Sequence, residues 1–201
     1  MTTKAVTGLY DTYEAATQTV RDLEAANIPH SDISLVAHQS YASEESNAAT
    51  GAETGAGTGA ALGGGVGLLA GLGILAIPGL GPVVAAGWLA AAAVGAVAGA
   101  VAGGATGGLI GSLTTAGVSK EDASFYAEGI RRGGALVTAR VDEGLVATTE
   151  AIMKRHGRID PTTREKLYRD GGWKQFDETA APYSTADVAR ERSLYRERVA
   201  P

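Results

Sequence analysis

The segment KAVTGLYDTYEAATQTVRDLEAANIPHSDISLVA, residues 4–37, carries the pattern from which the fold is predicted. Lys4–Tyr10 is apolar and rich in residues that favour strands, and Asp11 is an expected helix N-cap with an acid three residues on. The helix ends near Ala26, because the Asn-Ile-Pro that follows disfavours helical backbone. Ile33–Ala37 is a short apolar run and a second strand. The segment therefore predicts a compact β-α-β unit.

A second set of elements follows residue 118. Ser119 is the expected cap of a helix that ends at a Gly-Gly pair, and Ala135–Val141 alternates as a strand does. A helix over Glu143–His156 and a short edge strand at Arg158–Asp160 complete the pattern. The order β-α-β, then α-β-α-β, predicts an α+β fold, a ferredoxin-like domain made of residues 1–38 and 119–160.

The intervening sequence has a different composition. Residues 39–53 are polar and are expected to form a linker. No charged residue or histidine occurs between Glu53 and Lys120. Within 54–118 the apolar pattern predicts a helical hairpin, with helices over 57–77 and 83–113. The sequence Pro-Gly-Leu-Gly-Pro at 78–82 is expected to form the turn between them.

Glycines in this region recur at every fourth position in two runs. A period of four places them along one side of a helix, where the lack of side chains lets two backbones approach closely. Glycine destabilises a helix in water by about 1 kcal/mol relative to alanine, so repeated use favours a packing role. The residues predicted to mediate helix packing and assembly are Gly59, Gly63, Gly67, Gly71, Gly95, Gly99, Gly103 and Gly107.

Two settings fit such a hairpin. Two membrane-spanning helices need about 20 apolar residues each, which the uncharged stretch can supply. With no secretory signal recognised, the protein is expected in the cytoplasm or on the cytoplasmic side of the inner membrane. The alternative is a soluble homo-oligomer with the hairpins buried in its centre. Trp88, expected one turn into the second helix, fits a membrane interface or a contact over the turn equally well.

Composition excludes several classes of function. The chain has no cysteine, so it has no disulfide or thiol chemistry, and its net charge of −5 argues against nucleic acid as a partner. The three histidines are scattered and predict no metal site. A glycine motif at 55–60 lacks the strand and the acid that a dinucleotide-binding loop needs. No catalytic constellation is evident, so we expect no enzyme and no cofactor. A small-ligand sensor is a third, weaker alternative.

The tail, residues 161–201, is charged but also carries five of the eleven aromatic residues. Disordered tails are usually poor in aromatics, so short docked segments are predicted, with a helix near 185–199. Arginines on this helix, at 190, 192, 196 and 198, form a basic face. Neighbouring acids favour a solvated face, and contact with anionic lipid is the alternative.

Residues 4–37 resemble the start of the bacterial general stress protein, or heat-induced stress protein, domain. The resemblance continues through the Gly/Ala-rich region with its Pro-Gly-Leu-Gly-Pro turn, and through GVSKEDASFYAEGIRRGGALVTARV at 117–141. It extends to about residue 160, and GWKQFD in the tail also fits. The family implies a role in stress and no defined reaction, and it brings no catalytic residues.

Overall fold

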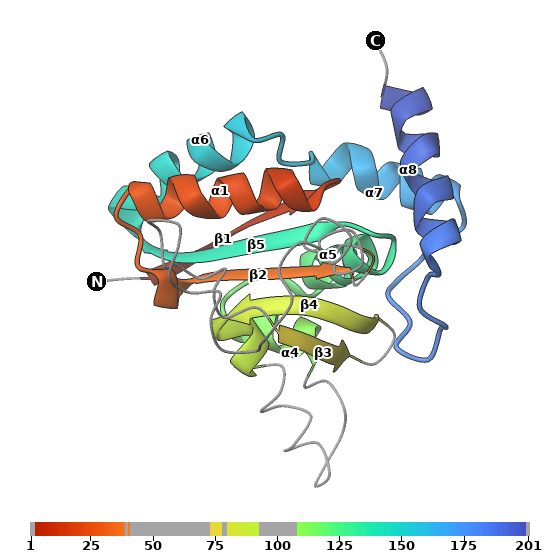
Figure 1. The fold of residues 1–201 in the computed structure, drawn as a ribbon, viewed down its shortest axis with the longest axis horizontal. Coiled ribbons are helices and arrows are strands. Elements are labelled where there is room, and N and C mark those ends of the chain that lie inside the picture. Colours follow the sequence, from red (N-terminus) through yellow and green to blue (C-terminus); the bar gives the residue numbers. More distant parts are fainter. Residues whose placement is uncertain (1–2, 39, 41–72, 78–79, 93–107, 200–201) are drawn as a thin grey trace, which may run out of the picture.

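A computed structural model describes residues 3–38, 40, 73–77, 80–92 and 108–199. Its centre is a five-stranded antiparallel sheet with the strand order β1-β5-β2-β4-β3. Helices cover both faces of this sheet, and the last two helices gather at the end of the sheet that lies away from the N-terminus (Figure 1). The expected α+β class is confirmed.

The N-terminal β-α-β unit forms as predicted. β1 spans Thr3–Tyr10, α1 spans Tyr13–Ala25 and β2 spans Ile33–His38, with a short 3-10 turn at His30–Asp32 before β2. The helix cap differs by one residue from the prediction: the hydroxyl of Thr12, not the carboxylate of Asp11, accepts a hydrogen bond from the Ala15 amide at 3.2 Å. The Asp11 carboxylate instead forms an ion pair with Arg164, which is described below.

The second set of elements begins where predicted. Ser119 caps α5, Lys120–Arg131, by accepting a bond from the amide of Asp122. β5 spans Ala135–Asp142, a 3-10 turn follows at Glu143–Leu145, and α6 spans Val146–Arg155. β5 lies between β1 and β2 and is antiparallel to both.

The predicted fourth strand at Arg158–Asp160 is not formed. The amide of Ile159 donates one hydrogen bond, 2.8 Å long, to the carbonyl of Leu9 in β1. Asp160 then caps α7 by accepting from the amide of Thr163, so the chain turns into a helix before a second ladder bond can form. In the described part of the sheet, β5 therefore lies between β1 and β2 of the β-α-β unit, and β1 is an edge strand.

The helical hairpin predicted for 57–77 and 83–113 is wrong at residues 73–77 and 83–87, which form strands. Residues Gly73–Ile77 form strand β3, and residues Gly81–Gly87 form strand β4. The predicted turn at 78–82 does separate two elements, and Leu80 donates to the carbonyl of Ile77 at 3.1 Å. Helical backbone occurs at 88–92 and in α4, Leu109–Thr115.

The physical reason lies in how β4 is buried. Val83 and Ala85 belong to the core on one face of the sheet, and Ala86 belongs to the core on the other. A strand covered on both faces is apolar throughout, so its sequence does not alternate between apolar and polar residues. Periodicity alone cannot distinguish such a sequence from that of a buried helix. β4 pairs with β2 from Ser34 to His38, so residues placed in a separate hairpin share the sheet of the predicted domain.

Two cores lie on opposite faces of the sheet. The first packs α1 and α6 against β1, β5 and β2, with Val20, Leu23 and Met153 fully buried. The second packs α4 and α5 against the other face, with Leu113 and Ile130 fully buried. Because side chains alternate along a strand, β5 sends Val137 into the first core and Leu136 into the second.

The tail docks on the second core, as predicted. We call residues 161–199 the C-terminal strap; it contains α7, Pro161–Asp170, and α8, Thr185–Val199. The helix expected near 185–199 is thereby confirmed. Three of the tail aromatics, Tyr168, Trp173 and Tyr195, are buried among one another and against α5.

Charged side chains fix the strap in place. Arg164 donates two hydrogen bonds, of 2.7 and 2.8 Å, to the carboxylate of Asp11. Arg132 at the end of α5 donates to buried Glu128 at 2.6 Å and to Glu191 of α8 at 2.7 Å. Burial would lower the pKa of Arg132, but the two carboxylates outweigh burial and raise it. Such paired charges are costly to separate once they are buried.

Candidate functional site beside Trp88 and Arg140

The eight glycines predicted to mediate assembly lie outside the described residues. They flank the β3–β4 hairpin in the sequence, at 59–71 and 95–107. The structure therefore brings none of them to a described site, and their packing role stays a prediction.

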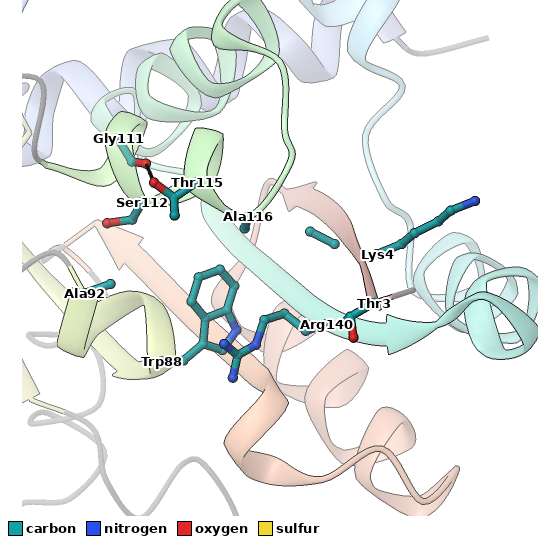
Figure 2. A pocket seen from close by; sticks show the side chains of 10 residues that line it. Thr3, Lys4, Trp88, Ala92, Gly111, Ser112, Thr115, Ala116 and Arg140 are labelled. Atoms are coloured by element: carbon teal, nitrogen blue, oxygen red, sulfur yellow. Dashed lines mark hydrogen bonds between the residues drawn. The ribbon is translucent and has the colours of Figure 1, made fainter. Parts of the chain in front are cut away.

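The described residues instead enclose a hollow of about 620 Å³ on the α4 and α5 side of the sheet. This volume is within the usual range of small-molecule sites, about 300–1,000 Å³. Its walls are formed by the start of β1, the end of β5, the helical residues 88–92 after β4, and the helix α4 (Figure 2). The residues that line it are Thr3, Lys4, Ala5, Trp88, Ala92, Gly111, Ser112, Thr115, Ala116 and Arg140.

Trp88 and Arg140 form one wall of the hollow. The Trp88 indole stands beside the Arg140 guanidinium in Figure 2, and the guanidinium carbon lies 4.7 Å from the ring centroid. One guanidinium nitrogen of Arg140 also donates to Asp32 at 2.9 Å and to the Ser31 carbonyl at 3.2 Å. These contacts fix the guanidinium against the ring, which is the cation–π arrangement.

Lys4 belongs to the edge of the hollow, but its side chain runs away from Trp88 and Arg140 (Figure 2). Its ammonium pairs with Glu143 at 2.7 Å, and both side chains are largely exposed, at 50% and 71%. An exposed pair of this kind contributes about 0–1 kcal/mol to stability. The side chain of Glu143 does not line the hollow.

Helix α4 supplies the third wall. The hydroxyls of Ser112 and Thr115 donate hydrogen bonds to carbonyls one turn earlier, those of Gly108 and Gly111 respectively. Each hydroxyl oxygen keeps lone pairs that can accept a hydrogen bond. Ala116 and Gly111 add small apolar surface between them. The wall is therefore smooth and mostly apolar, with two potential acceptors.

Sequence reasoning singled out Trp88 but missed the other residues of this hollow. Trp88 follows a strand directly, rather than lying one turn into a helix. A usable signal was present in β5, where Leu136, Thr138 and Arg140 share one face and become more polar along the strand. Nothing in the sequence indicated that α4 would lie opposite this face.

Within the described part of the chain, no group of three or more His, Asp or Glu residues is placed to hold a metal ion. Among the same residues, no helix combines the length and the apolar character that crossing a membrane requires.

A family model described as the heat induced stress protein YflT domain matches residues 5–75. The match includes β1, α1 and β2 and reaches into β3. Searches of the curated proteins and of the solved structures gave no match. The resemblance to bacterial general stress proteins is confirmed over this stretch, and it indicates a role in the stress response.

Proposed function

We propose that this chain is a non-enzymatic stress-response protein that assembles with copies of itself through its glycine-rich region, in the cytoplasm. The family match supports the stress-response part of this proposal. The assembly part rests on the glycine spacing and on where the structure holds the neighbouring residues.

The observation that carries the proposal is that the described residues next to both glycine runs lie at the same edge of the sheet. β3, the outermost described strand on that side, begins two residues after Gly71. Gly108, which follows Gly107 directly, lies beside Ile77 at the end of β3, because a Cβ placed on Gly108 would be 3.9 Å from Ile77 Cγ2. The described residues next to the two runs, Gly73 and Gly108, therefore both lie along β3.

Substitution in each glycine run tests the proposal. Gly63→Leu and Gly99→Leu add a bulky side chain where close backbone approach is proposed, so each should reduce the mass of the assembly in size-exclusion chromatography with light scattering. Gly144→Leu is the matched control, because Gly144 has open space around its Cα and lies far from both runs in the sequence. A wild-type monomer, or an equal effect of all three changes, would overturn the assembly proposal.

Fractionation tests the alternative in which the partner is a lipid bilayer. Native cells are lysed and centrifuged at high speed with and without detergent. The proposal expects the wild-type protein in the supernatant without detergent. Recovery in the pellet, with release only by detergent, would replace self-assembly in the cytoplasm by membrane association as the function of the glycine-rich region.

A further inference from the structure

His38 lies beneath the C-terminal strap, where β2 ends. The residue is 1% exposed, and its backbone amide donates to the Gly134 carbonyl at 3.3 Å. Its ring Nδ1 lies 3.1 Å from the amide nitrogen of Ser40, which can only donate, so Nδ1 carries no proton. The proton is therefore on Nε2, which donates to the carbonyl of Tyr183 at 3.2 Å, two residues before the start of α8.

The charged side chains around this contact include more arginines than carboxylates. Among the described residues, those that surround His38 and the Tyr183 ring are Arg131, Arg132 and Glu128 of α5, and Glu191 and Arg192 of α8. Each of the two carboxylates is already bonded to an arginine. The Tyr183 phenol stays neutral, because burial raises its pKa. A charge on His38 would therefore add to a positive excess.

Protonation of His38 would oppose the docking of α8 in two ways. A protonated imidazole has two donors and no acceptor, so Nδ1 and the Ser40 amide would face each other as donors. The new charge would also be buried and repelled by Arg192, which donates to the Gly133 carbonyl at 3.2 Å. Because Arg192 belongs to α8, movement of this helix both separates the two charges and admits water to the imidazole.

The helices α7 and α8 are held by different polar contacts. Arg164 of α7 makes two bonds to Asp11 at the end of β1, whereas Glu191 of α8 bonds to Arg132. The connection between the two helices, residues 171–184, is not helical. This arrangement allows α8 to leave the sheet while α7 stays docked.

We propose that the docking of α8 is controlled by pH: the helix is docked when His38 is neutral, and it separates from the sheet when His38 takes up a proton. Separation exposes Val188 and Tyr195, which are both buried in the docked state. This device does not involve the glycine-rich region, so it goes beyond the assembly proposed above.

Proton linkage gives the direction of the effect. Burial and Arg192 hold the pKa of His38 below 6.5 while α8 is docked, and the pKa returns toward 6.5 when α8 leaves. The undocked state therefore binds the proton more tightly, and acid favours it. For a single proton, the ratio of undocked to docked molecules rises at most about tenfold per pH unit.

Distances between nitroxide labels in the full chain test this proposal. The chain has no cysteine, so labels can be placed at Ala189→Cys on α8 and Ala151→Cys on α6, which are exposed positions. The exposed Thr162→Cys on α7, paired with Ala151→Cys, is the matched control. Between about pH 8 and pH 5, electron–electron resonance should show a growing population with longer α8–α6 distances and unchanged α7–α6 distances. Constant α8–α6 distances, or an equal change in both pairs, would overturn the proposal.

Three variants in the labelled chain assign the effect to His38. His38→Gln keeps a donor for Tyr183 but does not titrate, so its α8–α6 distances should not respond to pH. His30→Gln, at an exposed position, is its matched control and should respond as the wild type does. Arg192→Gln keeps a donor for Gly133 and removes the repelling charge, so it should reduce the displaced population. A wild-type response in His38→Gln, or in Arg192→Gln, would refute this mechanism.

Discussion

Gly133 connects the geometry of one residue to the docking of the C-terminal strap. It has a φ of +96°, in the left-handed region that glycine adopts without strain. A Cβ at this position would also collide with Cγ1 of Val188 in α8. Arg192 of the same helix donates to the Gly133 carbonyl at 3.2 Å. The glycine therefore serves both the turn after α5 and the close approach of α8.

We expect Gly133→Ala to destabilise the protein more than a positive φ alone explains. The left-handed backbone costs a residue with a side chain about 1–2 kcal/mol, and the collision with Val188 adds about 1–3 kcal/mol of overpacking. Gly117→Ala is the matched control, because Gly117 has a φ of +94° and nothing within 4 Å of its added Cβ. Urea unfolding measures both. Equal losses at the two glycines would show that α8 does not rest on Gly133.

His38 joins the strap to the end of β2. Its Nδ1 accepts from the amide of Ser40 at 3.1 Å, so the proton lies on Nε2, which donates to the Tyr183 carbonyl at 3.2 Å. Burial lowers the pKa of His38 below its ordinary value of 6.5, and the charge of Arg192 adds to this effect, although the Tyr183 bond opposes it. The folded protein thus favours the neutral imidazole.

Stability should fall as the pH drops below the ordinary histidine value of 6.5. There the unfolded chain binds a proton that folded His38 takes up only at lower pH, so the free energy of unfolding decreases. Urea unfolding between about pH 5 and 8 measures this slope. His38→Gln keeps a donor for Tyr183 and removes the titration, so its slope should be smaller. His30→Gln, at an exposed position, should keep the wild-type slope; a wild-type slope in His38→Gln would contradict this account.

Among the secondary-structure elements, prediction was accurate where the sequence carried a spaced apolar pattern or a clear capping signal. α1 buries one face and leaves the other more exposed, so its bounds follow from spacing, and α5 begins at its Ser119 cap. β5 was found between a Gly-Gly turn and the next helix. The β3–β4 hairpin was assigned to helices, because its alanines and glycines carry weak strand preference and pairing with β2 decides its structure.

The candidate site could be predicted less well than the fold. Trp88 attracted notice as a tryptophan in an uncharged region, whereas Arg140, a charge within an apolar strand, was not singled out. Their contact depends on β4 lying beside β2, and on β2 lying beside β5. That strand order links residues more than 50 positions apart, and no local pattern encodes it. The docked strap was predictable because its aromatics are unusual in a charged tail.

The sheet of the whole molecule has two ends with different roles. At the end where β1 stops, the strap closes the sheet with ion pairs and aromatic contacts. At the end where β1 begins, the hollow lies between the sheet and α4. The described residues between 73 and 115 belong to both parts, since β4 extends the sheet and α4 completes the second core. They should therefore support folding as well as any role in assembly.

Replacing residues 39–118 by a Gly-Ser bridge should consequently prevent a native fold. The deletion turns β2 into an edge strand and removes seven buried apolar residues from the second core, namely Ile77, Leu80, Val83, Ala85, Leu89, Leu109 and Leu113. Burial of a large apolar side chain contributes about 1.5–3 kcal/mol, so the loss is comparable with the whole stability of a typical domain, about 5–15 kcal/mol. Loss of cooperative urea unfolding, followed by circular dichroism, is the expected result.

A shorter deletion separates this explanation from a general effect of removing chain. Replacing residues 41–72 leaves every described residue in place. β2 and β3 flank β4 on opposite sides, with Ala85 opposite both Val36 and Gly73. The two strands are therefore about 10 Å apart, a distance that roughly ten Gly-Ser residues span. We expect this variant to unfold cooperatively, with stability close to that of the wild type. Cooperative unfolding of the longer deletion as well would show that β3, β4 and α4 are dispensable for the fold.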